Sequence, residues 1–242
     1  MNTIKLNKAG SSVKMIAHRG LSGLEQENTC AAFVAAGNRE TYFGIETDVH
    51  CTADGDFIII HDDNTQRVTG KDLVVEQTDF QTLRQLSVFD HGCNTPRGDL
   101  QLPKLQEYIG ICKRYEKVAV LELKNPMPED DICRIMKIVT EMEYADHMIV
   151  ISFYPENLFA LRKHYPHQAA QFLTSEWKDE WLTILKNNNL GLDIYHKTVT
   201  KELVDAVHSV GLEVNCWTVD DPQDAARVIA CGVDYITSNI LE

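Results

Sequence analysis

The sequence predicts an α/β protein in which eight parallel strands alternate with helices and close into a (β/α)8 barrel. Short segments rich in aliphatic and β-branched residues recur along the chain, and amphipathic helical segments separate them. These strand segments number eight when one hairpin arm is set aside. The length of 242 residues could hold two small domains, but barrels of this kind commonly occupy it as one.

The first expected strand, 13–18 (VKMIAH), ends at His18. An Ala-rich helix, CAAFVAA, follows it, with Asn28 or Thr29 as its N-cap and Gly37 after its last turn. Because parallel strands present their C-terminal ends at one mouth of a barrel, His18 is expected at that mouth.

The second expected strand, 42–48 (YFGIETD), carries two acidic residues. Side chains alternate along a strand, so Glu46 and Asp48 share one face. The segment 57–61 (FIIIH) follows the turn sequence ADG, which predicts a hairpin with the second strand. Residues whose numbers sum to about 107 would then pair, and this register places His61 opposite Glu46 on the same face.

The stretch 63–102 has a weak pattern. It contains one short expected helix, 79–86 (DFQTLRQL), within polar and Gly-containing sequence. About 40 residues is long for a simple connection, so we expect an inserted subdomain or lid after the hairpin. The predicted organisation is one barrel domain over 1–242 with a small insertion at about 63–102.

After the insertion, strands and helices alternate regularly. Pro128 lies in the first turn of one helix, Thr200 caps another that Gly211 ends, and Pro222 and Gly232 bracket the last. The expected strands are 117–123, 147–152, 168–173, 190–195, 212–217 and 233–236, and further helices are expected at 104–115, 128–144, 155–164 and 176–187. A doubly wound open sheet is the alternative, but no GxGxxG follows the first strand.

The composition excludes several classes of protein. A formal net charge of −13 opposes binding to nucleic acid or to an anionic membrane, whereas it is compatible with holding a divalent cation. No apolar run reaches the roughly 18–20 residues that span a membrane, and the N-terminal sequence lacks the apolar core of a secretory signal. We expect a cytoplasmic protein without a stable membrane anchor, and homo-oligomer formation stays open. Seven scattered cysteines without a CxxC pair indicate neither a zinc site nor a disulfide framework.

Three carboxylates are expected at the mouth of the barrel: Glu46, Asp48 and, from the strand AVLELK, Glu122. A lone acidic pair is more often a surface or salt-bridge feature, but buried charges in apolar strands need partners. Three carboxylates at one mouth would repel one another unless a cation joined them. Oxygen ligands favour Mg²⁺ or Ca²⁺ over zinc, so we predict a site for one of these ions.

Two histidines and two cationic residues complete the predicted site. His18 and His61 are the natural general acid and base, because imidazole titrates near neutral pH. Arg19 and Lys124 can hold a phosphoryl oxygen and stabilise its developing charge, although a salt bridge to a barrel carboxylate is an equal alternative for Arg19. The combination indicates metal-assisted chemistry on a phosphate.

Other residues are candidates for lining or supporting this site. Trp217 and Phe153 can form a flat wall for a carbon chain, or they can belong to the core. Glu27 can buttress a histidine or the neighbouring arginine, and Asn28 can be a simple helix cap. Two further histidines are kept as candidates for the mouth: His50 and His196.

A series of short motifs runs in order through almost the whole chain. The motifs are HRG (18–20), ENT (27–29), IETDV (45–49), TADG (52–55), HD (61–62) with Arg67, PKL (103–105), LELK (121–124), Ser152-Phe153, CWTVD (216–220) and GVDYITSN (232–239). In these motifs the chain resembles the glycerophosphodiester phosphodiesterase family of the phospholipase C-like phosphodiesterase superfamily. Two positions depart from the family pattern: Gln26 stands where Pro commonly precedes ENT, and Asn239 stands near the place of the common terminal Asp.

The resemblance implies a TIM barrel, a divalent metal ion and hydrolysis of a small-molecule phosphodiester, a glycerophosphodiester, to sn-glycerol 3-phosphate and an alcohol. It implies that the three carboxylates bind the metal and that His18 and His61 are the acid and base. It also implies that Arg19 and Lys124 contact phosphate. The small insertion that the family has after its HD motif corresponds to 63–102.

Two other functions stay open. A lysophospholipase D-like activity on lysophospholipids would need a more apolar mouth and access to a membrane, against which the acidic charge argues, although the insertion can supply an apolar wall. A non-catalytic metabolite-binding barrel should have lost a histidine or a carboxylate, and this chain keeps all five. The choice between a cyclic phosphate intermediate and direct attack by water also stays open.

Overall fold

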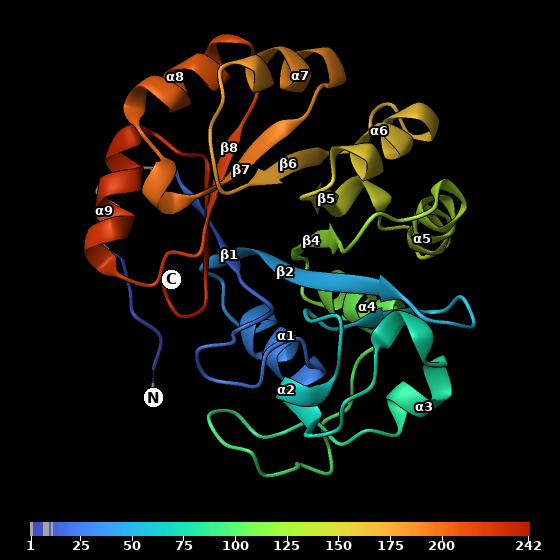
Figure 1. Ribbon diagram of the computed structural model, residues 1–242. Helices are drawn as coiled ribbons and strands as arrows, with labels where there is room; N and C mark the ends of the chain where they lie inside the picture. Colours follow the sequence, from blue (N-terminus) through green and yellow to red (C-terminus); the bar gives the residue numbers. More distant parts are fainter. Residues whose placement is uncertain (1, 7–9, 11) are drawn as a thin grey trace.

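A barrel of parallel strands surrounded by helices forms the centre of the computed structural model, which describes residues 2–6, 10 and 12–242 (Figure 1). The strands are β1 (Lys14–Ala17), β2 (Tyr42–Cys51), β3 (Phe57–Ile59), β4 (Val118–Leu123), β5 (Met148–Ser152), β6 (Ala170–Thr174), β7 (Gly191–Tyr195), β8 (Val214–Trp217) and β9 (Tyr235–Ser238). The α-helices are α1 (Cys30–Gly37), α2 (Gln66–Thr69), α3 (Phe80–Arg84), α4 (Leu105–Arg114), α5 (Glu129–Glu141), α6 (Pro155–His164), α7 (Glu180–Asn188), α8 (Lys201–Ser209) and α9 (Pro222–Cys231). Short 3₁₀ turns lie at Val75–Gln77 (η1), Ala145–His147 (η2) and His196–Thr198 (η3).

The strands close into a ring in the order β1-β2-β4-β5-β6-β7-β8-β9. Each pair of neighbours is parallel, and β1 pairs with both β2 and β9, which closes the sheet. The arm β3 pairs antiparallel with β2 outside the ring. The predicted closed (β/α)8 barrel is confirmed.

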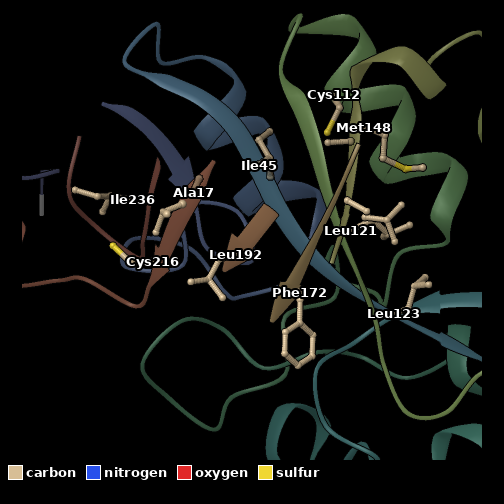
Figure 2. Close-up of a cluster of buried hydrophobic side chains, with 14 of the residues drawn as sticks. Ala17, Ile45, Cys112, Leu121, Leu123, Met148, Phe172, Leu192, Cys216 and Ile236 are labelled. Atoms are coloured by element: carbon tan, nitrogen blue, oxygen red, sulfur yellow. The ribbon is translucent and has the colours of Figure 1, made fainter. Parts of the chain in front are cut away.

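Alternation along the strands divides the core into two layers. One layer packs the outward side chains of the strands against the helices, and Figure 2 shows Ala17, Ile45, Leu121, Leu192 and Ile236 among its members. The other layer fills the inside of the barrel and consists of Ile16, Val120, Ile149, Ile151, Leu173 and Tyr235. Glu46, Asp48 and Glu122 share the inward parity, so they reach the mouth of the barrel above this apolar filling.

Helix ends follow the expected signals. Thr29 caps α1, accepting a hydrogen bond from the backbone N–H of Ala32, so of the two candidates Thr29 and not Asn28 is the cap. Thr200 caps α8 in the same way. Gly232 ends α9 in the left-handed conformation at a φ of 91°.

The longest helix, α5, shows how the helices bury one face against the sheet. Pro128 precedes its first turn, and acidic residues fill that turn, where they complement the helix dipole. Its buried side chains are Ile132, Ile135, Met136 and Val139. In the part of the chain that the structure describes, no helix has the length and apolar character needed to cross a membrane.

The register predicted for the hairpin is wrong by one residue. The observed pairs are Val49–Ile59, His50–Ile58 and Cys51–Phe57. His61 is therefore not opposite Glu46. The cause is the turn, which has three residues between Thr52 and Asp56: the backbone N–H of Thr52 donates to the carbonyl of Asp56 at 2.8 Å, and Gly55 takes the left-handed conformation.

The segment between β3 and α4 has an apolar cluster of its own and appears in teal and green beside the barrel in Figure 1. The buried members of this cluster are Ile58, Ile60, Val68, Val75, Leu83, Leu86, Val88, Leu100 and Leu102. The helix expected at 79–86 is present as α3, whereas α2 and η1 were not predicted. Because Ile58 and Ile60 belong to the hairpin arm, the cluster joins this segment to the strand that leads to His61.

Gly20 and Gly211 provide a matched test of how tightly the loop after β1 packs. Both have a left-handed backbone, with φ of 76° and 80°. A Cβ on Gly20 would lie 2.6 Å from the carbonyl carbon of Ala32, whereas a Cβ on Gly211 would meet nothing within 4 Å. Gly211→Ala should therefore lower the free energy of unfolding by about 1–2 kcal/mol through backbone conformation alone.

Gly20→Ala should lower the free energy of unfolding by a further amount of about 1–3 kcal/mol, because the loop must move away from α1. Urea unfolding of both variants measures the difference. Equal losses in the two variants would show that the loop does not pack as described.

Candidate active site

The C-terminal ends of the strands surround a cavity of about 60 Å³ at the mouth of the barrel. Its polar lining consists of His18, Arg19, Glu46, His61, Glu122, Asp193 and Thr237, and its apolar lining of Ile151, Phe153, Leu173 and Trp217. A wider groove of about 470 Å³ shares His61, Glu122 and Phe153 with the cavity and extends along Asp62 and Lys124. The structure thus brings together residues of β1, β2, β4 and β8 that the sequence singled out.

Glu46, Asp48 and Glu122 form a buried cluster. Parallel pairing of β2 with β4 sets Asp48 beside Glu122, and Glu46 lies two residues earlier on the same face of β2. Each of the three offers a carboxylate oxygen, and these oxygens all lie within 4.8 Å of one another. Three such groups in one buried site can share a cation or share protons, but they cannot all stay ionised without compensation.

The pKa values in the cluster diverge. Burial, followed by the charge of Asp48, raises the pKa of Glu122 to about 7 and that of Glu46 well above its usual range. Burial also acts to raise the pKa of Asp48, but Arg19 and Lys124 outweigh it and hold this pKa well below its usual range. One carboxylate of the cluster therefore favours the ionised form, while the other two resist ionisation because they are buried and lie next to it.

Two cations border the cluster without balancing it. The Arg19 Nε atom lies 3.5 Å from Asp48 Oδ2, and the Lys124 Nζ atom lies 2.9 Å from Glu122 Oε1 and 3.7 Å from Asp48 Oδ1. Asp48 Oδ1 is buried and has no hydrogen-bond partner among the described residues. An orphaned carboxylate oxygen in an all-oxygen donor set is what a hard divalent cation would satisfy.

Asn28 orients Asp48 and is not a helix cap. Its side-chain amide donates to Asp48 Oδ2 at 2.8 Å, and its carbonyl oxygen accepts from the hydroxyl of Thr47 at 2.7 Å. Both Asn28 and Arg19 have a φ of 53°, and the backbone N–H of Asn28 donates to the carbonyl of Arg19. Strained left-handed residues of this kind persist only where the surroundings fix them, as they do here.

His18 lies directly after β1 and is held by an amide. Its Nδ1 atom is 2.7 Å from the side-chain oxygen of Asn239. An amide oxygen only accepts, so Nδ1 carries the hydrogen, which leaves Nε2, 3.9 Å from Glu46 Oε2, free of a proton. Burial, and next the charge of Arg19, lowers the pKa of His18 to about 4. Asn239 is itself held by Asp220, whose Oδ2 accepts from the amide at 2.6 Å.

His61 follows β3 and is backed by a carboxylate. Its Nδ1 atom lies 2.8 Å from Asp62 Oδ1. Although the predicted register is wrong, the backbone N–H of Ile60 bonds the carbonyl of Asp48, and this bond carries His61 to the lining of the cavity. Burial is the main cause that lowers the pKa of His61, with the charge of Asp48 opposing it.

Glu27 connects the barrel to the segment after the hairpin. It accepts from Arg19 Nη1 at 2.8 Å and from two nitrogens of Arg67, each at 2.8 Å. Arg67 also donates to both carboxylate oxygens of Asp62, at 2.6 and 3.0 Å. Glu27 thus supports Arg19 directly and His61 through Arg67 and Asp62.

Of the four remaining candidate residues, two line the cavity and two do not. Trp217 and Phe153 both line the cavity, with ring centroids 5.5 Å apart in an edge-to-face arrangement. His50 is fully buried, and its Nδ1 atom lies 3.0 Å from Glu76 Oε1. Its Nε2 atom lies 3.4 Å from the backbone carbonyl oxygen of His61. His196 is buried with its Nδ1 3.8 Å from Asp224. Neither His50 nor His196 is in the lining of the cavity.

The sequence interpretation missed Asp193, whose carboxyl lines the cavity from β7. The signal was present in the expected strand LGLDIY, where one acidic residue interrupts an apolar run. Alternation along that strand would have placed Asp193 inside the barrel, as an ionisable group in need of a partner.

Known proteins match the chain over nearly its full length. A family model described as the glycerophosphoryl diester phosphodiesterase family matches residues 18–241. A glycerophosphodiester phosphodiesterase from Caldanaerobacter subterraneus is 29% identical over 93% of this chain and 93% of that protein. One from Bacillus altitudinis is 28% identical over 92% of this chain and 93% of its own length.

Solved structures that are similar to this chain are also phosphodiesterases. A phosphodiesterase from Oleispira antarctica, in complex with the product sn-glycerol-3-phosphate, is 26% identical and superposes with a TM-score of 0.86, over 94% of this chain and 93% of that one. A glycerophosphodiester phosphodiesterase from Parabacteroides distasonis, also 26% identical, gives a TM-score of 0.80 over 95% and 93%. Since the family model covers almost the whole sequence, this chain belongs to the glycerophosphoryl diester phosphodiesterase family.

Proposed function

We propose that this protein is a metal-dependent enzyme that hydrolyses glycerophosphodiesters to sn-glycerol 3-phosphate and an alcohol. The observation that carries the proposal is the cluster of three buried carboxylates, with oxygens within 4.8 Å of one another, in a cavity that two histidines also line. The similar phosphodiesterase from Oleispira antarctica, in complex with the product sn-glycerol-3-phosphate, supports the choice of substrate class.

Glu46, Asp48 and Glu122 are the proposed ligands of Mg²⁺ or Ca²⁺. Two observations support binding of such a cation by these residues. All the donor atoms are oxygens. Asp48 Oδ1 is buried and has no hydrogen-bond partner within residues 2–6, 10 and 12–242. When bound, such a cation polarises a phosphoryl oxygen and stabilises the charge that develops on it.

His18 and His61 move the protons in the proposed reaction. One histidine accepts a proton from the nucleophile, which is either water or the glycerol hydroxyl next to the ester, and the other donates a proton to the leaving alcohol. The partner of each Nδ1, Asn239 for His18 and Asp62 for His61, fixes the ring so that Nε2 is the atom that exchanges the proton.

Arg19 and Lys124 contact the phosphate in this proposal. Both side chains are largely buried at the edge of the cluster and carry fixed positive charge next to Asp48. Trp217 and Phe153 form the apolar side of the same cavity, where they exclude water and pack against carbon atoms of the substrate.

We also propose that the chain is a single barrel domain in which 63–102 is an insertion. This segment supplies Asp63 and Asn64 to the groove that leads to the cavity, and it supplies Arg67 to the network around Glu27. Its apolar cluster includes residues of the hairpin arm, so it would not fold apart from the barrel.

Removing the divalent cation should abolish activity and lower stability. EDTA should stop the release of sn-glycerol 3-phosphate from glycerophosphocholine, and Mg²⁺ or Ca²⁺ should restore it. A cation that binds only the folded protein at 100 times its Kd adds about 2.7 kcal/mol of stability, so the Tm of the cation-free protein should rise when the ion is added.

Asp48→Asn should abolish this rise in Tm, because it removes the charge of the central proposed ligand. Asp205→Asn is the matched control, since Asp205 is an exposed carboxylate on α8 that pairs with Lys201. A rise in Tm for Asp48→Asn equal to that of the wild type would place the cation elsewhere.

Replacing either histidine should remove catalysis and leave cation binding intact. His18→Ala and His61→Ala should each lower kcat by about 10²- to 10⁴-fold, the usual contribution of a positioned acid or base. Their Tm should still rise with added cation, because neither histidine is a proposed ligand. His91→Ala, at an exposed position in the 63–102 segment, is the control. Full activity of either active-site variant would exclude that residue as acid or base.

A further inference from the structure

Asp193 presents to the cavity a buried carboxyl group that lacks a hydrogen-bond partner among the residues that the structure describes. The residue is 2% exposed, and its Oδ1 atom makes no hydrogen bond within the described part of the chain. A polar group buried in this way destabilises the protein unless a bound molecule satisfies it.

The polar side chains next to Asp193 form hydrogen bonds with groups other than its carboxyl group. Trp217 Nε1 lies 3.4 Å from the backbone carbonyl of Asp193 and does not reach its carboxyl group. On the adjacent strand, the amide of Asn215 donates to Gln171, and its side-chain oxygen accepts from Thr237. The polar interior of the barrel is therefore satisfied around Asp193, and its carboxyl group is left facing the cavity.

Asp193 lies across the cavity from the β2 carboxylates. Three strands separate β7 from β2 in either direction around the ring, so the two strands are opposite each other. Glu46 and Asp193 both line the cavity of about 60 Å³ between them. A phosphate held at the β2 side would direct the rest of a small substrate toward β7.

The chemistry of the Asp193 side chain suits a hydroxyl ligand. Burial, and next the charge of Glu122, raises the pKa of Asp193 well above its usual range. A carboxyl oxygen accepts a hydrogen bond from an alcohol hydroxyl whether or not the carboxyl group is ionised. The apolar residues beside it, Leu173 and Trp217, fit the carbon atom that bears such a hydroxyl.

We propose that Asp193 binds the terminal hydroxyl of the glycerol moiety and thereby selects deacylated glycerophosphodiesters over lysophospholipids. This inference rests on the function proposed above. In a 1-acyl lysophospholipid the terminal oxygen is esterified, so it has no proton to donate to Asp193. The cavity of about 60 Å³ is also too small to enclose its acyl chain. Asp193 is thus a specificity-determining residue.

The test compares sn-glycero-3-phosphocholine with its 1-deoxy analogue, which lacks the terminal hydroxyl but keeps the hydroxyl next to the phosphoester. For the wild type, kcat/KM should be about 10- to 100-fold lower with the analogue, because the analogue leaves the buried carboxyl unpaired. Asp193→Leu should lower kcat/KM by a similar factor with glycerophosphocholine and leave it nearly unchanged with the analogue. Asp193→Asn, whose amide still donates and accepts, should keep most of the preference.

Three results would overturn the inference. The first is equal activity of the wild type on the two diesters, a comparison that requires no variant. The second is an equal loss on both diesters in Asp193→Leu, which would show a structural role alone. The third is hydrolysis of 1-palmitoyl lysophosphatidylcholine by the wild type as efficient as that of glycerophosphocholine. Failure of the wild type to hydrolyse either diester would instead overturn the proposed function, and this inference with it.

Discussion

The mutual repulsion of three buried carboxylates is the constraint on which the arrangement of the barrel mouth depends. Strand alternation places Glu46, Asp48 and Glu122 on the inward face, and the pairing of β2 with β4 fixes their spacing. Arg19 and Lys124 supply two positive charges to three acidic groups, so one negative charge or its equivalent in protons is left over. A divalent cation would turn this excess of one negative charge into an excess of one positive charge, which would act on the phosphate of a substrate.

Much of the surrounding structure serves to keep these groups in place. Glu27 holds Arg19 and Arg67 together, so the loop after β1 and the segment after the hairpin converge on the same ion-pair network. The ion pairs of Arg67, whose side chain is half exposed, add little stability on their own, so their main effect is to fix geometry. Two different partners orient the two histidines: the amide of Asn239, far along the chain from His18, and the carboxylate of Asp62, next to His61. The cavity between these elements is small, which favours a compact substrate such as a glycerol phosphoester.

Features set by local periodicity were predictable, and features set by long-range contacts were not. The alternation in GIETD and LELK was sufficient to place the carboxylates on the inward face, and turn and cap signals located most helices. The hairpin register was wrong because a three-residue turn at Thr52–Asp56 cannot be told from a two-residue turn by composition. The bond between Asn28 and Asp48 was missed because the local context of Asn28 favoured a helix cap, and the contact of His18 with Asn239 spans 221 positions. The short elements of 63–102 are held by the small apolar cluster, which leaves no periodic signal.

In the proposed enzyme, Glu46, Asp48 and Glu122 together bind one divalent cation beside His18 and His61. The most direct measurement is anomalous diffraction from crystals soaked in Mn²⁺, which replaces Mg²⁺ or Ca²⁺ among oxygen ligands. We predict one strong anomalous peak bounded by carboxylate oxygens of these three residues. A peak bounded by other residues, or an unperturbed cluster without a peak at saturating Mn²⁺, would show that these carboxylates do not bind the cation.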